Sequence, residues 1–468
     1  MNTKFLKVLF VLFVFPVVVL SQTNHGFAFD NYSGIYGVTA NPANSVDSKY
    51  NIHVNVLSYN QLGSSDMGSL HNFQLEAAPN GFNGLNFSNN FEDGKDGYSF
   101  GHSDIMLPSV VWNFHENFAI GLVSRYRSMF DYNNVNGNLL QVLSANPQQT
   151  DDFTFDNQEL NNTAHSFTEF GLNLSAVVVN SNYHFVKFGG TIKYYSGERA
   201  TEVAGSLSGS LNNNDLQIGQ NTANPLIHLN TAENTGAASS QESFVSSAFN
   251  FSNSGSGVGG DVGIVYEWRP RETNRVNVRS NSSAVNKYKI KISASVLDVG
   301  TISYKEALKD SIIVNSTANV ASNNTINQEN NLIANLIASE NSTNIPRQGE
   351  VKFALPRSLH LNFDYIILND NNYYININYV KSLNTATDLY ANTQMDMVTL
   401  TPRYETRKFS IYLPVSLVSN TGEITAGLGA RYGPVTIGAA ALSSMFTNNK
   451  VSHLYFGLSI PLMKELYR

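Results

Sequence analysis

Apolar and polar residues alternate between residues 404 and 463, and this alternation predicts four consecutive β-strands. In residues 409–417 the apolar side chains fall on the odd positions, and in residues 454–462 they fall on the even positions. Residues 419–422, Gly433-Pro434 and residues 447–450 supply turn-forming residues between the strands. A period of two is typical of an antiparallel strand with one apolar face, so this stretch predicts a β-meander.

The same period recurs along most of the chain before the meander. With the meander the predicted strands number about fourteen, and the earlier ones cover residues 52–59, 107–114, 118–128, 170–178, 188–194, 262–268, 288–296, 359–365, 373–379 and 395–404. The pattern therefore predicts an all-β protein.

The connections between these strands differ in length according to their order. Those after strands 1, 3, 5 and 7 run to tens of residues, whereas those after strands 2, 4, 8, 10 and 12 have only a few. The exception is residues 269–286, which carry Arg269, Arg271, Arg275 and Arg279. A soluble β-sandwich gives no reason for this parity, but an outer-membrane barrel has short periplasmic turns and long extracellular loops. The sequence thus predicts a transmembrane antiparallel β-barrel with both termini in the periplasm.

Aromatic residues support the barrel interpretation. A strand of about ten residues, tilted by ~40°, stands ~25 Å tall, which matches the apolar band of such barrels. Rings next to the short turns would form the aromatic girdle of one interface; the alternative is that they close the ends of a soluble core. The rings concerned are Trp112, Phe114, Phe118, Tyr183, Tyr266, Trp268, Tyr288, Tyr365, Tyr373, Tyr404 and Tyr432.

The N-terminus reads as an export signal. Lys4 and Lys7 precede an apolar run over residues 8–20, which is shorter than the ~20 residues of a membrane-spanning helix. We expect a signal peptide over residues 1–21, a periplasmic or plug segment over residues 22–50, and the barrel over residues 51–468. An anchoring helix is the alternative for the first segment.

Composition excludes several other functions. The chain has no cysteine, which rules out disulfides, thiolate metal sites and a lipid-anchored cysteine. Its net charge of −7 argues against a nucleic-acid partner. Its glycine clusters fit no dinucleotide fingerprint, and the histidines have no metal-ligand spacing. We therefore expect neither enzymatic activity nor a cofactor or metal.

Charged residues on the strand faces opposite the apolar ones are the candidate functional residues. Charge facing lipid would cost ~2 to 4 kcal/mol at the membrane midplane, so these side chains should face the lumen. They would either bind a solute or pair with one another. The candidates are Arg125, Arg127, Lys187, Lys193, Glu267, Lys289, Lys291, Asp364 and Arg431.

Two polar connections contain apolar residues at helical spacing. Leu139, Leu140, Val142 and Leu143 form one group, and residues 332–337 contain the other. Such helices would either pack over the mouth of the barrel or form an apolar capture site above it.

Residues 22–50 are expected to fold into the barrel as a plug. Fourteen strands enclose more space than their own side chains fill. This segment lies next to the first strand and combines aromatic residues with glycines. Asn41 and Pro42 suit a sharp turn within it, because proline fixes φ and restricts the residue before it. The alternative is a leader that contacts only the rim.

Several stretches together resemble a known family. They are Ala40-Asn-Pro-Ala43, Ser295-Val-Leu-Asp-Val-Gly-Thr-Ile-Ser-Tyr304 and Leu355-Pro356. They look like an uncharacterised domain-of-unknown-function family of outer-membrane β-barrels, which is itself similar to the long-chain fatty-acid transporter FadL and to the PorV-type barrels of type IX secretion. The resemblance implies passage of small hydrophobic molecules across the outer membrane, with membrane lipid and a hydrophobic small molecule as partners. A non-transporting surface scaffold that binds secretion-system proteins is the alternative, and an outer-membrane hydrolase is a more distant one.

Overall fold

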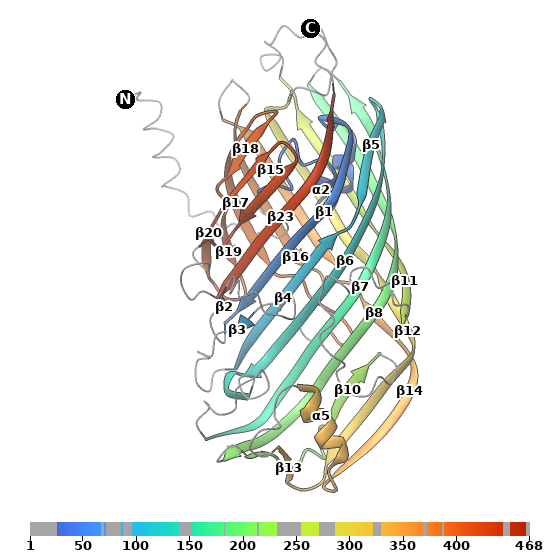
Figure 1. The fold of residues 1–468 in the computed structure, drawn as a ribbon, viewed down its shortest axis with the longest axis vertical. Coiled ribbons are helices and arrows are strands. Elements are labelled where there is room, and N and C mark those ends of the chain that lie inside the picture. Colours follow the sequence, from blue (N-terminus) through green and yellow to red (C-terminus); the bar gives the residue numbers. More distant parts are fainter. Residues whose placement is uncertain are drawn as a thin grey trace, which may run out of the picture.

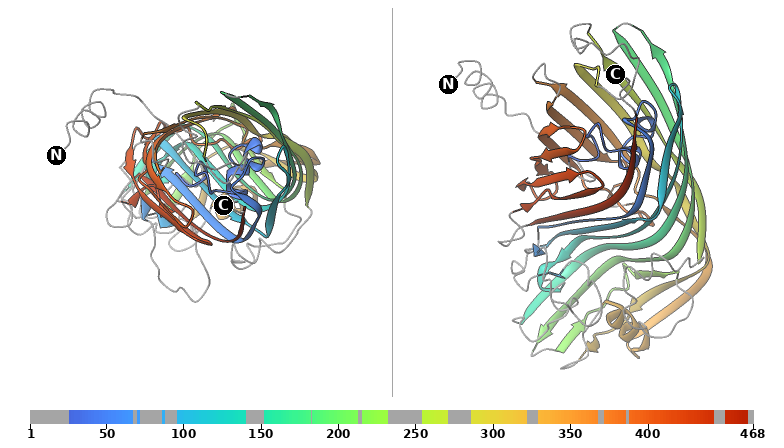
Figure 2. Two further views of the ribbon diagram at one scale, coloured as in Figure 1. Left: turned by 90° about the horizontal axis from the view of Figure 1, so that it is seen from above. Right: turned by 45° about the horizontal axis from the view of Figure 1, so that its top comes forward.

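The computed structural model is a closed ring of antiparallel strands with a segment of chain inside it (Figures 1 and 2). It describes residues 26–66, 70–71, 86–87, 96–139, 152–181, 183–212, 215–231, 254–270, 286–321, 329–367, 372–385, 388–442 and 450–464. Residues 1–25, with the expected signal peptide, lie outside the described residues. Among the described helices, none is long and apolar enough to cross a membrane.

The wall of the ring has fourteen strands, which is the predicted number. Four of them consist of two consecutive segments. In order they are β1 (Tyr50–Ser65), β4 with β5 (Asp96–Met106, Ser109–His115), β6 (Phe118–Asn136), β7 (Phe153–Asn180), β8 (His184–Asn212), β11 (Gly255–Trp268), β12 (Ile290–Val314), β14 with β15 (Ser342–Ala354, Ser358–Ile366), β16 (Tyr373–Ser382), β17 (Met397–Glu405), β18 with β19 (Phe409–Tyr412, Val415–Val418), β20 with β21 (Ile424–Ala426, Leu428–Tyr432), β22 (Val435–Ala439) and β23 (Val451–Met463).

Smaller elements lie inside the ring and at one end of it. Helices α2 (Ile35–Val38) and η1 (Pro42–Ser45) belong to the segment inside, and α5 (Glu329–Ala338) covers the opposite end (Figure 1). The remaining short strands are β2 (Leu70–His71), β3 (Asn86–Phe87), β9 (Asp215–Ile218), β10 (Leu226–Asn230) and β13 (Ala318–Ala321).

The first and last strands close the ring. β1 pairs with β23 in antiparallel register, with Val54 opposite Ile460 and Tyr59 opposite Phe456. On its other edge β1 pairs with β4 and β5. Among the described strands, closure leaves no free edge where the sheet spans the membrane. A sheet in lipid requires this, because unpaired backbone groups have no water to bind there.

Side chains alternate between the outside and the inside of the wall. Leu172, Leu174 and Ile192 are exposed on the outside, whereas Asn173 and Lys193 beside them are buried inside. An apolar outer surface is stable only against lipid, so the predicted transmembrane barrel is confirmed.

The two ends of the barrel differ as the loop lengths predict. One end, here called the short-turn end, has tight reversals such as residues 115–118 and 406–409 and lies at the top of Figure 1. The other, here called the long-loop end, carries α5 and β13. Of the predicted girdle, Trp112, Phe114 and Trp268 are exposed near the short-turn end. Tyr288 was assigned wrongly, because it lies inside and donates a hydrogen bond to Asp364.

Several strands are much longer than their apolar pattern predicts. β7 has 28 residues, β8 has 29 and β12 has 25. Residues 153–165, 198–212 and 305–314 read as polar loops in the sequence, but they continue the wall toward the long-loop end. The barrel therefore projects far beyond the ~25 Å apolar band on that side.

Candidate functional site

Residues 26–49, here called the plug, fill the barrel at the short-turn end. Phe27, Ile35, Tyr36 and Val38 are buried in one apolar cluster with wall residues that include Tyr412. The segment is drawn in dark blue inside the ring in Figure 2. Gly26 and Gly34 have positive φ angles, and the Gly34 Cα lies against the ring of His53, where a side chain would not fit. The plug therefore packs as a folded element, not as an extended tail.

Asn41 and Pro42 join the plug to two adjacent strands. The Asn41 side-chain oxygen accepts a hydrogen bond from the backbone N–H of Ala43 at 2.9 Å and so caps η1. Its Nδ2 donates to the carbonyls of Ile264 in β11 at 3.3 Å and Ala294 in β12 at 3.1 Å. Asn41 and Pro42 thus lie at the start of a 3₁₀ helix. Asn41 also contacts the wall, which the sequence did not predict.

Two wall glycines make this approach possible. A Cβ atom on Gly189 of β8 would lie 2.5 Å from the Pro42 carbonyl carbon, and one on Gly263 of β11 would lie 2.2 Å from the Asn41 side-chain oxygen. Any larger residue at either position would collide with the plug. These glycines are plug contacts that periodicity alone does not reveal.

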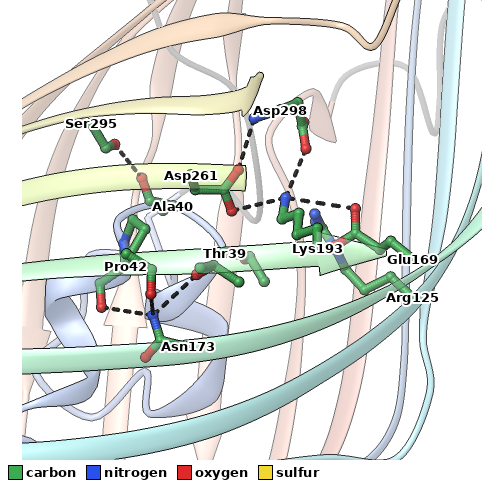
Figure 3. Close-up of polar contacts among 12 residues, drawn as sticks. Thr39, Ala40, Pro42, Arg125, Glu169, Asn173, Lys193, Asp261, Ser295 and Asp298 are labelled. Carbon is green, nitrogen blue, oxygen red and sulfur yellow. Dashed lines mark hydrogen bonds and ion pairs between the residues drawn. The ribbon is translucent and has the colours of Figure 1, made fainter. Parts of the chain in front are cut away.

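Further polar contacts surround η1. Asn173 of β7 donates from Nδ2 to the Pro42 carbonyl at 3.2 Å, and Ser45 donates to Asn173 Oδ1 at 2.6 Å. Lys187 donates to the Val46 carbonyl at 3.1 Å, and Ser295 donates to the Ala40 carbonyl at 2.7 Å. Figure 3 shows the Asn173 and Ser295 contacts on either side of the segment.

The opposite side of the plug is held by charged groups. Asp30 forms an ion pair of 3.3 Å with Arg431 and accepts a hydrogen bond from Tyr412. Asn31 donates to Glu405 at 2.8 Å. Burial raises the pKa of Tyr32, which lies beside them in the plug, to about 12. Hydrogen bonds and ion pairs of this kind hold the plug in position, but the contact is reversible because water can replace each of them.

A layer of charged side chains crosses the lumen next to the plug. Lys193 lies 2.8 Å from both Asp261 and Asp298 (Figure 3). Arg125 lies 2.6 Å from Glu169, and Arg127 lies 2.8 Å from Asp298. We call this set, with Asp104 at 3.1 Å from Arg125, the charge layer. The layer consists of Asp104, Arg125, Arg127, Glu169, Lys193, Asp261 and Asp298.

The remaining candidate residues lie elsewhere along the wall. Arg403, which the sequence did not single out, joins Asp364 at 2.6 Å, and Lys291 lies 3.6 Å from the same carboxylate. Glu267 pairs with Arg269 at 2.6 Å. Lys187 and Arg431 contact the plug. Lys289 differs from the others, because its amine donates to the Ile366 carbonyl and lies 4.7 Å from the ring of Tyr365 at the rim.

The acidic members of the charge layer were missed for different reasons. Glu169 lies at the edge of the predicted strand 170–178 and was not singled out. Asp261 lies one residue before residues 262–268, on the inward-facing odd positions, so extending that strand at its period of two finds it. Asp298 has the parity of the outward-facing Ile292, and its positive φ of 56° breaks the alternation and brings it to the lumen. Asp104 belongs to β4, which reads as a polar loop in the sequence.

An apolar layer follows the charge layer toward the long-loop end. Met129, Phe167 and Tyr195 lie two residues from Arg127, Glu169 and Lys193 on the same inner faces. The Arg127 guanidinium lies 5.5 Å from the Phe167 ring, so the two layers touch. His165 and Tyr304 share a hydrogen bond of 2.9 Å inside the layer. We define the apolar layer as Met129, Phe167, Tyr195, Ile302, Tyr304, Phe353 and Leu355.

Residues 388–396, here called the inner loop, belong to the connection between β16 and β17 and contact both the apolar layer and the wall around it. Asp131 of β6 accepts hydrogen bonds from Asn392 Nδ2 at 3.0 Å and from the Thr393 backbone N–H at 2.9 Å. Ala391 forms a parallel bridge with Ala354 of β14. Tyr390 packs 6.4 Å from the Phe353 ring. A loop at the long-loop end thus folds back into the lumen.

One of the two predicted helices covers the far end. Residues 329–338 form α5, and Leu332, Ile333 and Leu336 are buried in an apolar cluster with Val135, Leu207, Ile312 and other inward residues. Of the other segment only Leu139 is among the described residues, and it belongs to the same cluster. Helix α5 therefore packs over the mouth.

Solved structures to which the chain is similar include two toluene transporters and a FadL homologue. The Pseudomonas putida toluene transporter TodX is 9% identical, with a TM-score of 0.41, over 95% of this chain and 98% of that one. The Ralstonia pickettii toluene transporter TbuX is 11% identical, with a TM-score of 0.42, over 96% and 97%. A Pseudomonas aeruginosa FadL homologue is 9% identical, with a TM-score of 0.41, over 95% and 99%.

No curated protein matches the chain. A family model does, and it spans residues 42–440, from the Pro42 contact to the end of β22. The matched region includes nearly the whole barrel wall, the charge layer and the apolar layer. The chain belongs to DUF5723, a family of unknown function.

Proposed function

We propose that this protein passes small hydrophobic molecules across the outer membrane, and that the plug and the inner loop are its two movable closures. The observation that carries the proposal is the apolar layer inside the outer half of the barrel. A barrel that passes water-soluble molecules has a polar interior. Here Phe167, Tyr195, Tyr304 and Phe353 face the lumen instead.

Two buried atoms in the apolar layer refine the class of molecule. The Tyr195 hydroxyl and His165 Nδ1 have no hydrogen-bond partner among the described residues. Leaving a buried polar group unpaired costs about 1 to 3 kcal/mol. A mainly apolar molecule with one polar group would satisfy such an atom while its apolar part contacts the rings.

The closures are suited to movement. A barrel that needed only to be filled could use about eight strands and its own side chains. This barrel is wider, and its interior is filled by the plug and by the inner loop. Both contact the wall through hydrogen bonds or ion pairs in addition to apolar packing. Groups of this kind exchange protein partners for water at a small net cost per bond.

We place the short-turn end in the periplasm and the long-loop end outside the cell. Short periplasmic turns and long outer loops are the rule for outer-membrane barrels. A molecule would then enter at the long-loop end, pass the inner loop into the apolar layer, and leave when the plug moves.

A reversible crosslink tests this route. The chain has no cysteine, so Ala354→Cys with Ala391→Cys introduces one disulfide between β14 and the inner loop. Whole cells are the suitable assay, because lipopolysaccharide slows apolar molecules at the outer surface. We expect oxidation to reduce uptake of a labelled hydrophobic molecule and a reductant to restore it. The matched control, Ile313→Cys with Thr343→Cys, links β12 to β14 without the loop and should leave uptake unchanged.

A non-transporting surface or secretion-associated scaffold is the second candidate. The charge layer favours it, because its acidic and basic groups pair with one another and need no solute. Uptake that is the same with the inner loop crosslinked and free, together with co-purification of secretion proteins, would support the scaffold instead.

A further inference from the structure

The outer part of β14 has backbone pairing on one edge only. This edge pairs with β12 along the whole strand, Ser342–Ala354. The next strand of the wall, β16, pairs with β15 and ends at Ser382, opposite Ser358. Among the described strands, none pairs with the other edge of β14, which lies at the lower right of Figure 1. Residues 345–350 are all exposed, so this stretch of the strand is open to solvent.

Pro346 shows which backbone groups point away from β12. In an antiparallel strand the N–H and C=O of one residue point to the same side, and proline occupies edge strands where its nitrogen faces solvent. Gln348 and Glu350 have the same parity as Pro346, so their N–H and C=O groups also point away from β12. Ala354 has this parity too, and its N–H donates to the Tyr390 carbonyl of the inner loop at 2.7 Å. The inner loop therefore ends the free stretch, and we call the edge along residues 344–352 the open edge.

The side chains beside the open edge favour a particular partner. Ile345 and Arg347 lie two residues apart on one face of β14, and Ile345 is 42% exposed. Arg347 lies directly opposite Lys309 of β12, and it forms no ion pair with any described residue. Like charges opposite each other are unfavourable, so a carboxylate on the other side of Arg347 would be stabilising. An apolar side chain would be favoured beside Ile345 for the same geometric reason.

We propose that the open edge binds an extended segment of another polypeptide, which adds a strand antiparallel to β14. Because the two strands run in opposite directions, the residue that faces Arg347 comes two positions before the residue that faces Ile345. The bound segment therefore has an acidic residue, any residue, and then an aliphatic residue.

A second copy of this chain does not fit the open edge. Two copies in one membrane have the same orientation, so their β14 strands cannot run antiparallel to each other. Parallel pairing in register would bring Arg347 against Arg347, which is unfavourable. Binding of a segment does not depend on transport; only its position outside the cell rests on the orientation given with the proposed function.

Disulfide crosslinking tests both the binding and the register. The chain has no cysteine, so Gly349→Cys places a single thiol on the face of β14 that carries Ile345 and Arg347. A synthetic peptide with the core Cys-Thr-Glu-Thr-Ile, flanked by threonines, brings its thiol opposite residue 349 when its glutamate faces Arg347. We mix this peptide with the full-length protein in neutral detergent under mild oxidation. We expect the disulfide to form about fivefold faster than with the peptide in which glutamate and isoleucine are exchanged.

Variants of the open edge supply the controls. Gln348→Pro removes one N–H from the open edge and none from the ladder with β12, so it should slow the disulfide about fivefold. Gln348→Thr keeps this N–H and should react at the original rate. Arg347→Glu should reverse the preference, so that a peptide with lysine in place of glutamate reacts faster. An unboiled gel checks that each variant is a folded barrel, and if Gln348→Pro is not, the charge reversal decides the question.

Two outcomes would overturn the proposal. Equal rates for the original and the exchanged peptide would show that the thiols meet without a defined register. Disulfide-linked dimers of Gly349→Cys that exclude the peptide would assign the open edge to a second copy. A failure of the uptake assay would count against transport and leave the crosslinking result unaffected.

Discussion

Asn41 and Gly263 meet so closely that a methyl group on the glycine would lie 2.2 Å from the asparagine side-chain oxygen. The plug can approach β11 this closely because Gly263 has no side chain. Adding one carbon at a close-packed position costs about 1 to 3 kcal/mol. Gly263→Ala should therefore displace the plug and leave the wall intact. The chain has no cysteine, so Thr39→Cys places a single thiol on the plug, and its labelling by a water-soluble maleimide reports exposure of the plug. This labelling should rise about tenfold, since about 1.4 kcal/mol corresponds to a factor of ten in a population.

Gly349→Ala is the matched control. Gly349 also lies in a strand, but nothing is within 4 Å of the position that its Cβ would take. This variant should label at the original rate. Equal labelling of the two variants would show that the Asn41 contact does not hold the plug.

Removal of one cation from the charge layer should destabilise the barrel. Lys193 compensates Asp261, Asp298 and Glu169 within 4 Å. Lys193→Met would leave these buried carboxylates with too little positive charge, at a cost of roughly 3–5 kcal/mol. The folded form on unboiled gels should convert at a lower temperature. Lys352→Met, on the exposed face of β14, should not shift that temperature, and a similar shift in both variants would refute the explanation.

Loss of the Asp131 carboxylate should release the inner loop. Three hydrogen bonds from Asn392 and Thr393 end on Asp131. Asp131→Ala removes all three, and we expect faster uptake of a labelled hydrophobic molecule by whole cells. Asp156→Ala removes an exposed carboxylate near the same end and should have no effect. Slower or unchanged uptake by Asp131→Ala would contradict a gating role for the loop.

Docking of the plug should depend on pH through Lys49. Its pKa is lowered from 10.5 to about 7, mainly by burial, so the docked plug favours the neutral amine. This contribution is present above pH 10.5 and is lost as the pH falls toward 7 and below. Asp47 of the plug, Glu267 and Arg269 at the end of β11, and Lys187 of β8 surround the amine.

Labelling of Thr39→Cys, divided by that of an exposed Gly349→Cys, should therefore decrease between pH 6.5 and pH 9. Lys49→Met should weaken this dependence. A ratio that rises with pH in the unaltered plug would exclude Lys49 as the group responsible.

The wall was predictable because lipid imposes a simple rule on it. Residues such as Leu172, Leu174 and Ile192 must be apolar where they face hydrocarbon, so the period of two is visible there. Beyond the membrane the outward residues are polar, as in the outer part of β14 with Arg347, Gln348 and Glu350. The period is then lost, and long strands read as loops.

The interior was less predictable because its contacts join distant parts of the chain. The bases Arg125, Arg127 and Lys193 could be assigned to the lumen, since charge is excluded from the lipid face. Their partners could not be assigned, because Asp298 of β12 meets Arg127 of β6 across the lumen, over three intervening strands. The inner loop gave no periodic signal, as its position depends on hydrogen bonds to Asp131.

Closure of the ring through β1 and β23 also has a kinetic consequence. Tyr59 and Phe456, which lie opposite each other, are separated by almost the whole chain. Contacts between residues so far apart form late and slowly, because a long loop must close before they can be made. The plug precedes β1 and is made first, yet its enclosure is complete only after β23 has paired. During assembly, the free edge of β1 must therefore be kept from pairing with other chains until β23 reaches it. Pairing of β23 is thus the step at which insertion can be controlled.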